Sequence, residues 1–134
     1  MDVIDQLQRA LNLHDVQAMA ACFADDYRSE QPVHPARGFS GREQVVENWS
    51  LYFREIPDVR MDVLDRVGGD EAVWLEVRFH GTRRDGSPFD LRGVIIARLT
   101  DDLISRARFY VEPVDEDGAD IHETVRRWAE GEPS

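Results

Sequence analysis

The sequence predicts an α+β domain in which helices come first and an antiparallel sheet follows. Up to about residue 57, apolar residues recur every three or four positions, as on one face of a helix. From residue 59 onward they alternate with polar residues, which is the period of a strand with one buried face. Short segments rich in Gly and Asp separate the alternating stretches, as in a meander of neighbouring strands.

Two short helices are expected at the start of the chain. Asp2 and Asp15 are typical N-cap residues for them, and the segment "NLHD" interrupts the pattern between the two. The apolar stripes consist of Val3, Ile4, Leu7, Ala10 and Leu11 in the first helix and of Val16, Met19, Ala20 and Phe23 in the second.

A short strand is expected next, over residues 27–31, because Pro32 cannot donate to a ladder and so ends it. In "SGRE", Ser40 and Glu43 have the spacing of a capping box, which predicts the start of a third helix. Pro57 closes that helix. Its broad apolar stripe consists of Val45, Val46, Trp49, Tyr52, Phe53 and Ile56.

Four alternating stretches are expected to form the meander. "RRDG" predicts a hairpin turn in which Gly86 supplies the positive φ, and "TDD" predicts a second turn. The apolar positions are Val59, Met61 and Val63, then Val73, Leu75, Val77 and Phe79, then Phe89, Leu91, Gly93, Ile95 and Ala97, and finally Ala107, Phe109 and Val111.

The other face of this sheet is expected to carry charges of both signs on neighbouring strands, with Trp74 and Tyr110 among them. One interpretation is a solvated lattice of cross-strand ion pairs. The other is a subunit interface with two aromatic anchors, since aromatic and Arg residues are enriched in interfaces. The second interpretation predicts a homodimer that packs through the charged sheet face.

Composition limits the partners and the location of the protein. The chain of 134 residues is expected to form one domain, residues 1–134, and its net charge of −11 argues against nucleic acid and anionic membrane surfaces as partners. No apolar run reaches the ~20 residues of a membrane span. The segment "MDVIDQLQRA" is acidic and amphipathic, so a cytoplasmic location is expected.

Neither a metal nor a cofactor is expected. Cys22 is the only cysteine, which excludes an intramolecular disulfide and a thiolate metal cluster. The four histidines do not have HxH or HExxH spacing, and the chain contains neither a glycine-rich phosphate loop nor a GxSxG motif.

The order of the expected elements resembles that of a known superfamily. The stretches "LHDVQAMAACFADDYRSEQP", "GREQVVENW" and "LRGVIIARLTDDLISRARFYVEP" are similar to nuclear transport factor 2-like proteins, and among these to SnoaL-like polyketide cyclases and ketosteroid isomerases. The resemblance covers about residues 1–112. It implies a cone, an α+β barrel of the cystatin-like kind, whose curved sheet wraps around the N-terminal helices and leaves an apolar pocket open at one end.

The catalytic groups of the related ketosteroid isomerases do not carry over to this sequence. Their Asp base and their oxyanion-hole Tyr and Asp fall on Gln31, Leu7 and Ile95. An amide cannot take a proton from carbon at neutral pH, and aliphatic side chains cannot stabilise an enolate.

Two other activities of the superfamily also lack support. The positions that would hold the Asp-Arg-Asp set of limonene epoxide hydrolases are Leu75, Val77 and Phe109. SnoaL-like cyclases use an acidic residue near the end of the meander, where Glu112 is the nearest acid. Its parity places it on the charged face unless a bulge at Pro113 re-aims it.

The resemblance implies an apolar pocket whose polar groups come from residues 25–41 and the third helix. Gln31 is expected to orient a ligand carbonyl or hydroxyl, or to satisfy loop backbone groups. His34 is the candidate general acid–base, because imidazole exchanges protons near neutral pH, or a rim residue that holds the loop "PVHPARG". The expected ligand-binding residues are Phe23, Ser29, Gln31, Trp49, Phe53, Leu75, Val77, Phe79, Leu91, Ile95, Ala107, Phe109 and Val111.

Three functions are therefore compatible with the sequence. The first is an isomerase- or cyclase-type enzyme that acts on a small, largely apolar, oxygenated molecule with His34 and Gln31 as its catalytic groups. The second is a protein that binds such a molecule without turnover. The third is an accessory domain whose cone is only a packed core.

Residues 113–134 lie beyond the resemblance and are expected to form a loop and a final helix. Asp120 and Glu123 have a capping pattern, and Ile121, Val125 and Trp128 fall on one stripe. A short helix needs a surface to pack on. It is expected either to pack on its own sheet edge or a partner subunit, or to form a lid over the cone mouth that brings Trp128 near the loop of His34 and Arg37.

Overall fold

The computed structural model describes residues 1–132. Over that range, the elements in chain order are α1 (Val3–Asn12), α2 (Val16–Ala20), β1 (Phe23–Glu30), the 3-10 turn η1 (Pro35–Arg37), β2 (Phe39–Ser40), α3 (Arg42–Glu55), β3 (Arg60–Gly68), β4 (Ala72–Thr82), β5 (Pro88–Thr100), β6 (Leu103–Pro113) and α4 (Ile121–Ala129).

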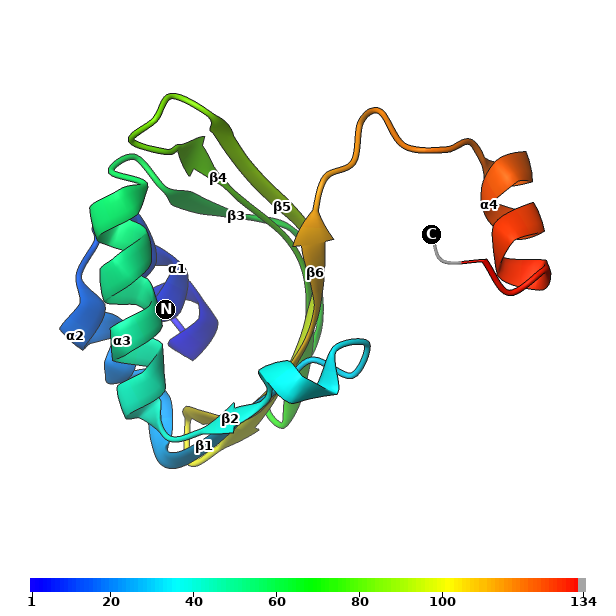
Figure 1. Ribbon diagram of the computed structural model, residues 1–134. Coiled ribbons are helices and arrows are strands. Elements are labelled where there is room, and N and C mark those ends of the chain that lie inside the picture. Colours follow the sequence, from blue (N-terminus) through cyan, green and yellow to red (C-terminus); the bar gives the residue numbers. More distant parts are fainter. Residues whose placement is uncertain (133–134) are drawn as a thin grey trace.

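The strands form one six-stranded sheet in the order β2-β1-β6-β5-β4-β3, which curves around α1, α2 and α3 (Figure 1). This arrangement confirms the α+β class and the expected cone. One pairing differs from the predicted antiparallel sheet, because β1 runs parallel to β6, with Ser29 opposite Ala107. The two strands are far apart in sequence, so local periodicity contains no information on their pairing.

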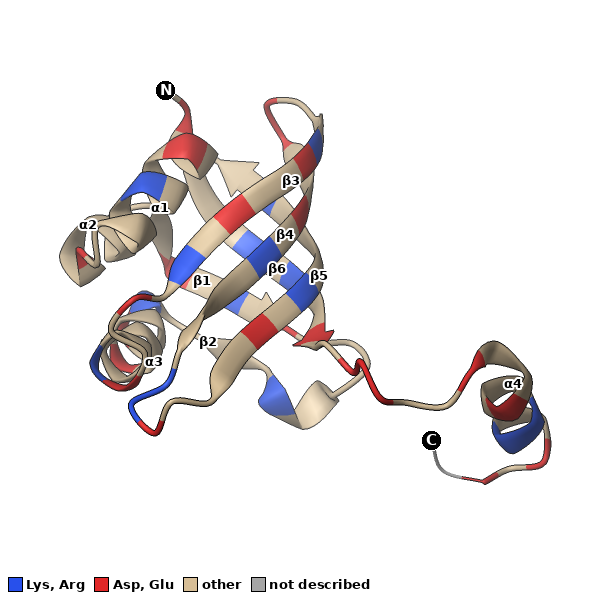
Figure 2. Ribbon diagram, turned by 90° about the horizontal axis from the view of Figure 1, so that it is seen from above, with Lys and Arg blue, Asp and Glu red and all other residues tan. Residues whose placement is uncertain are grey.

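The core lies between the N-terminal helices and the concave face of the sheet. Ile4 and Leu11 of α1 and Met19 of α2 are fully buried, in one cluster with Leu75 and Val77 of β4. Burial of each such side chain stabilises the fold by about 1.5–3 kcal/mol. The predicted amphipathic helices and the alternation of the meander are confirmed by this packing, and Figure 2 marks where charged residues of both signs occur along the strands.

The segment around Phe23 differs from the prediction. Phe23 begins β1 rather than ending α2, which stops at Ala20. The pairing with β6 decides this, because Phe23 lies opposite Ile104 and the Ile104 N–H donates to the Cys22 carbonyl at 2.9 Å. A bulge between residues 23 and 28 breaks the alternation, so the sequence pattern did not reveal the first half of the strand.

The predicted capping box at Ser40 and Glu43 is wrong. Ser40 lies in β2 opposite Arg28, and Gly41 is the N-cap residue of α3, without a side-chain cap. Gly41 has φ 91° and donates its N–H to the Tyr27 carbonyl at 2.7 Å. The ladder between β1 and β2 therefore keeps Ser40 extended, and the glycine makes the sharp turn into the helix.

The C-terminal helix α4 stands apart from the barrel (Figures 1 and 2). Asp120 caps it as predicted, with its side chain accepting from the Glu123 N–H at 3.0 Å. Its apolar residues Ile121, Val125 and Trp128 are exposed, and it does not lie over the open end of the cone. The expected lid is therefore not formed in this structure, and the expected C-terminal segment 113–134 extends two residues beyond the described range.

Within residues 1–132, none of the helices has the length and apolar character that a membrane crossing requires.

Candidate functional site

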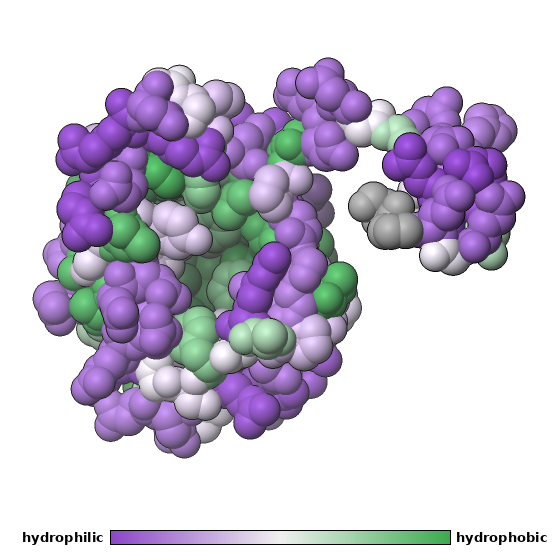
Figure 3. All heavy atoms as spheres, viewed as in Figure 1, coloured by the Kyte–Doolittle hydropathy of each residue, from purple (hydrophilic) through white to green (hydrophobic). Residues whose placement is uncertain are grey.

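The helices and the concave face of the sheet enclose a pocket of about 160 Å³ that opens at one end of the cone (Figure 3). Its wall is formed mainly by apolar side chains from β1, α3 and the β4–β6 strands. The lining residues are Phe23, Tyr27, Ser29, Gln31, Phe39, Val45, Asn48, Trp49, Tyr52, Phe79, Phe89, Leu91, Phe109 and Val111.

Aromatic rings in mutual contact shape the wall. The Trp49 ring of α3 lies 4.8 Å from the Tyr52 ring and 5.7 Å from the Phe79 ring of β4, measured between centroids. The Phe23 ring meets the Tyr27 ring edge-on at 4.6 Å. Such ring pairs are more favourable than their buried area alone suggests. They provide a rigid, flat-sided pocket, as ligand sites commonly have.

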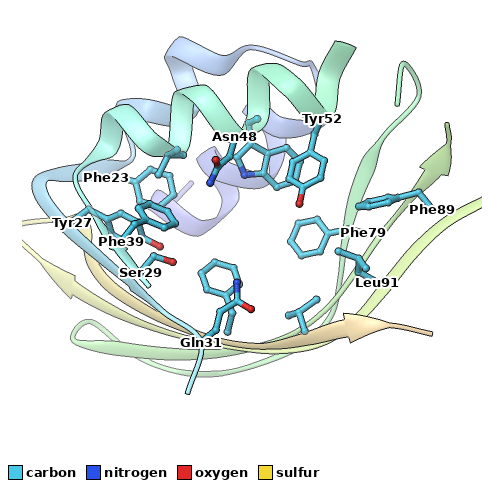
Figure 4. A pocket seen from close by; sticks show the side chains of 14 residues that line it. Phe23, Tyr27, Ser29, Gln31, Phe39, Asn48, Tyr52, Phe79, Phe89 and Leu91 are labelled. Carbon is cyan, nitrogen blue, oxygen red and sulfur yellow. The ribbon is translucent and has the colours of Figure 1, made fainter. Parts of the chain in front are cut away.

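The polar groups in the wall come from two sides, as expected. Ser29 and Gln31 project from the end of β1, and Asn48 and Tyr52 project from α3 across the pocket (Figure 4). None of the lining residues carries a carboxylate, an ammonium or a guanidinium group. The pocket therefore has hydrogen-bonding groups but no formal charge with which to stabilise a charged ligand.

Tyr27 is the most deeply buried polar residue of the wall. Burial raises its pKa to about 12, while a hydrogen bond with the Ser29 hydroxyl acts in the opposite direction. Its phenol is therefore neutral at physiological pH. Ser29 is itself only 4% exposed, so the two hydroxyls form a buried polar pair at the base of an apolar wall.

Gln31 directly follows β1, and its side chain is tied to the loop beyond. The Arg37 guanidinium donates from Nη1 to Gln31 Oε1 at 3.1 Å. Arg37 ends η1 and reaches Gln31 from outside the pocket lining. The structure thus places the Gln31 amide in the pocket wall, as the sequence predicted.

His34 does not line the pocket. Its Nε2 hydrogen bonds with Glu112 Oε1 at the rim, and Arg37 Nη1 lies 3.8 Å from the other Glu112 oxygen. Glu112 lies opposite Arg92 in the β5–β6 ladder, which places it on the charged face, as its parity predicted. His34, Arg37 and Glu112 form a polar cluster outside the lining, which we call the rim cluster.

The structure brings most of the expected ligand-binding residues together in the pocket wall. These are Phe23, Ser29, Gln31, Trp49, Phe79, Leu91, Phe109 and Val111. Five others lie outside it, namely Phe53, Leu75, Val77, Ile95 and Ala107. The last four belong to the buried core on which α1 and α2 pack. The Phe53 ring instead stacks on the His14 ring, with 4.4 Å between centroids.

Six lining residues were not in the predicted set, namely Tyr27, Phe39, Val45, Asn48, Tyr52 and Phe89. Helical spacing could have found Asn48, because residues 45, 48, 49 and 52 share one face of α3. Phe39 lies in β2, a two-residue strand that depends on pairing with β1 and has no local pattern. Among residues 1–132, no cluster of three or more His, Cys, Asp or Glu side chains has an arrangement suited to a metal ion.

Solved structures with this architecture include proteins crystallised with small molecules. A Mycobacterium tuberculosis protein in complex with estradiol-17beta-hemisuccinate is 19% identical and has a TM-score of 0.70, over 86% of this chain and 92% of that chain. A ketosteroid isomerase-like protein from Catenulispora acidiphila in complex with trimethylamine is 17% identical, with a TM-score of 0.69, over 81% and 84%.

IdmH of Streptomyces antibioticus, a candidate polyketide cyclase, is 20% identical with a TM-score of 0.70, over 82% of this chain and 89% of that chain. At these identities the three similarities show the fold. No curated protein matches the chain. The model of the SnoaL-like domain matches residues 4–107, which is more than half of the chain. The protein therefore belongs to the SnoaL-like domain family.

Proposed function

We propose that the protein binds a small, neutral, largely apolar molecule that carries oxygen atoms, in the pocket between α3 and the sheet. The observation that carries this proposal is the composition of the wall. Aromatic and aliphatic side chains surround uncharged polar groups, among them those of Tyr27, Ser29, Gln31, Asn48 and Tyr52, and no ionised group lines the pocket. A ligand gains free energy by burying apolar surface there, and the polar groups orient it.

Similar structures in complex with small molecules support a binding function. The Mycobacterium tuberculosis and Catenulispora acidiphila proteins were crystallised with a steroid ester and an amine. Those ligands belong to those proteins, and the pocket of the present chain has its own lining. Its volume of about 160 Å³ argues for a compact ligand.

A second candidate function is acid–base catalysis of the isomerase or cyclase type at the mouth of the pocket. The observation that favours it is the hydrogen bond between His34 and Glu112. A carboxylate that binds one ring nitrogen sets the tautomer and the orientation of the imidazole. Because His34 is outside the lining, a proton transfer requires that the reacting atom lies at the rim, while Gln31 orients the part of the molecule inside.

Native mass spectrometry of the purified protein tests the binding proposal. We expect a retained small molecule, or saturable binding of single-ring aromatic compounds added to the protein. Leu91→Trp, which fills the mouth of the pocket, should abolish binding. Leu64→Trp, at an exposed position of β3, is the matched control and should not. If the two variants bind alike, the pocket is not the site.

Catalysis is tested separately with the same ligand once it is known. Turnover that is lost in His34→Gln, with binding retained, supports the enzymatic function. Binding without turnover in the wild-type protein supports a binding protein. A chain that binds nothing, with a pocket closed to all probes, supports the accessory-domain interpretation.

A further inference from the structure

We propose that the pocket selects a single-ring ligand that accepts a hydrogen bond, such as an aromatic ketone or aldehyde, and that Arg37 is the positioning residue that sets this preference. This inference rests on the proposed binding function and goes further, because it specifies the polarity of the group that the ligand presents to Gln31. It depends on which end of the Gln31 amide faces the pocket.

The hydrogen bond from Arg37 decides the orientation of that amide. Arg37 Nη1 lies 3.1 Å from Gln31 Oε1. A guanidinium group has only donors, so its partner on an amide must be the oxygen. If the amide turned over, its NH2 group would meet the guanidinium donor to donor. The oxygen is therefore held toward the loop, and the NH2 group points into the pocket (Figure 4).

Arg37 is held in place by the rest of the rim cluster. Its Nη1 lies 3.8 Å from Glu112 Oε2, while Glu112 Oε1 engages His34 Nε2. The Arg37 N–H also donates to the His34 carbonyl at 2.9 Å, within the turn that η1 forms. These contacts link the charged end of β6 to the pocket wall. They give the rim cluster a role that does not require any of its members to touch the ligand.

The Asn48 amide on the opposite wall does not impose a polarity in the same way. Gln44 Nε2 donates to Asn48 Oδ1 at 2.7 Å, which leaves the Asn48 NH2 group toward the pocket. Both partners are amides, so the pair can reverse together and expose the Asn48 oxygen instead. Hydroxyls such as that of Tyr52 donate and accept equally well. Of the two amides in the wall, Gln31 is thus the one whose orientation is fixed by its partner, because a guanidinium group can only donate.

The size of the pocket limits the ligand to one ring with a short substituent. A protein cavity of about 150 Å³ takes up benzene, and this pocket has about 160 Å³ and an open end. The fused rings of a steroid exceed that space. The Trp49 and Phe79 rings, which contact each other with 5.7 Å between centroids, present aromatic faces on which a planar molecule can pack.

Acetophenone and α-methylstyrene test the inference, because they have the same shape and differ in a carbonyl oxygen against a methylene group. Binding is measured by NMR titration of the full chain. We expect acetophenone to bind the wild-type protein at least about fivefold more tightly, since its oxygen satisfies the Gln31 NH2 group that the hydrocarbon leaves unpaired. Gln31→Leu should reduce the affinity ratio, acetophenone over α-methylstyrene, to about one.

Arg37→Met keeps the aliphatic stem and removes the guanidinium, so the Gln31 amide can turn and the ratio should fall to less than half of its wild-type value. Arg60→Met, on an exposed residue at the start of β3, is the control and should keep the wild-type ratio. A purely structural role of Arg37 would weaken both probes together and leave their ratio unchanged, and that result would overturn the role proposed for Arg37.

Equal affinity of the two probes for the wild-type protein would overturn the acceptor preference while the proposed binding function stands. If neither probe binds at millimolar concentration, the proposed function and this inference both fail.

Discussion

The sequence resemblance aligns Gln31 with the Asp base of the ketosteroid isomerases, and the structure puts Gln31 in the pocket wall. The two positions that match their oxyanion hole do not support such chemistry either. Leu7 packs against the core, and Ile95 is buried outside the pocket lining. On that alignment the chain lacks all three groups, and a shared fold does not imply a shared activity.

We expect no isomerisation of a β,γ-unsaturated ketosteroid by this protein. Gln31 cannot act as a base, and the pocket of about 160 Å³ is small for a steroid. The measurement is the ultraviolet absorbance of the conjugated product at high enzyme concentration. Turnover that persists in Gln31→Ala and His34→Ala would contradict the alignment of these positions.

Asp2 links the first helix to the sheet. Its side chain caps α1 by accepting from the Asp5 N–H at 3.0 Å, and it forms an ion pair with Arg66 of β3. The hydrogen bond from Arg66 is the main reason that its pKa lies below the usual 3.8, while partial burial acts in the opposite direction. A carboxyl whose pKa is lowered on folding stabilises the fold above its unfolded pKa.

Asp2→Ala should lower the free energy of unfolding by about 1 kcal/mol at pH 7, mainly through loss of the cap. Asp2→Asn keeps the cap but not the charge, so it should cost only a few tenths of a kcal/mol because the ion pair is exposed. The contribution of the charge is lost as pH falls below about 4. Urea titrations between pH 3 and pH 7 should therefore show that the difference in the free energy of unfolding between Asp2→Asn and the wild-type protein becomes smaller in acid. A constant difference would contradict the role of the charge.

At the scale of elements, the curved sheet forms one side of the pocket, and Gly93 of β5 allows two of its strands to lie close together. Its φ is 156°, and a Cβ atom there would lie 1.9 Å from the Tyr110 carbonyl oxygen of β6. The two strands approach each other more closely at this point than any side chain allows. The residue therefore permits the close approach of β5 and β6 opposite Val111, which lines the pocket.

Gly93→Ala should lower the free energy of unfolding by at least about 2 kcal/mol, because the strand must shift or the backbone must take up the overlap. Gly69→Ala is the matched control, since nothing lies within 4 Å of the added atom and its φ is not positive. Chemical denaturation measures both. Similar stabilities for the two variants would show that β5 and β6 can separate at Gly93 without cost.

Helix α4 has an apolar stripe that packs on no part of the barrel. Trp128 is 67% exposed, while Arg126 and Glu130 pair along the helix at 2.5 Å. Such pairs and the Asp120 cap support a short helix locally, by a few tenths of a kcal/mol for each pair. The element is therefore held by its own sequence rather than by the core.

Deletion of residues 119–134 should leave the thermal melt of the domain cooperative and its midpoint unchanged within about 2 °C, because none of residues 119–132 is buried. Ligand affinity and release should also stay the same, since α4 does not cover the pocket mouth. Ile4→Ala, which empties a core position, should cost about 2–5 kcal/mol and provides the contrast. Loss of the cooperative melt in the truncated chain would identify α4 as a strut, and faster ligand release would identify it as a lid in solution.

At the scale of the whole molecule, the convex face of the sheet presents apolar groups among its charges. Trp74 is 54% exposed and Tyr110 is 39% exposed. The strand register places Val67 opposite Trp74, and Val94 opposite Tyr110, on this face. Arg78 and Arg92 both pair with Asp90 beside them. The combination of aromatic anchors and paired charges is typical of an interface core with a polar rim.

We expect the protein to form a homodimer through this face. Sedimentation equilibrium at tens of micromolar should give twice the monomer mass of 15.4 kDa. Trp74→Asp should give monomers, because it places an unpaired charge at the centre of the contact. Leu51→Asp, at an exposed position of α3, is the control and should remain dimeric. A monomeric wild-type protein at these concentrations would rule out the dimer.

The periodicity of the sequence determined which face of the N-terminal helices and of the meander strands turns inward, since burial of one face requires a repeat of 3.6 or 2. It also determined the absence of charge from most of the concave face and the place of Gln31 at the end of a strand. The sequence pattern did not determine where β1 begins, that it runs parallel to β6, or that Ser40 belongs to a strand. These features depend on backbone pairing between distant segments.

Only the tertiary structure decided which inward-facing residues line the pocket and which form the core. Leu75 and Phe79 have the same parity on β4 and both belong to the buried cluster, yet only Phe79 lines the pocket. The same holds for the Gln31 amide, whose orientation depends on an Arg six positions later and, through it, on Glu112 of β6. A one-dimensional pattern specifies the face of a strand, whereas the neighbour that meets this face is set by how the whole chain packs.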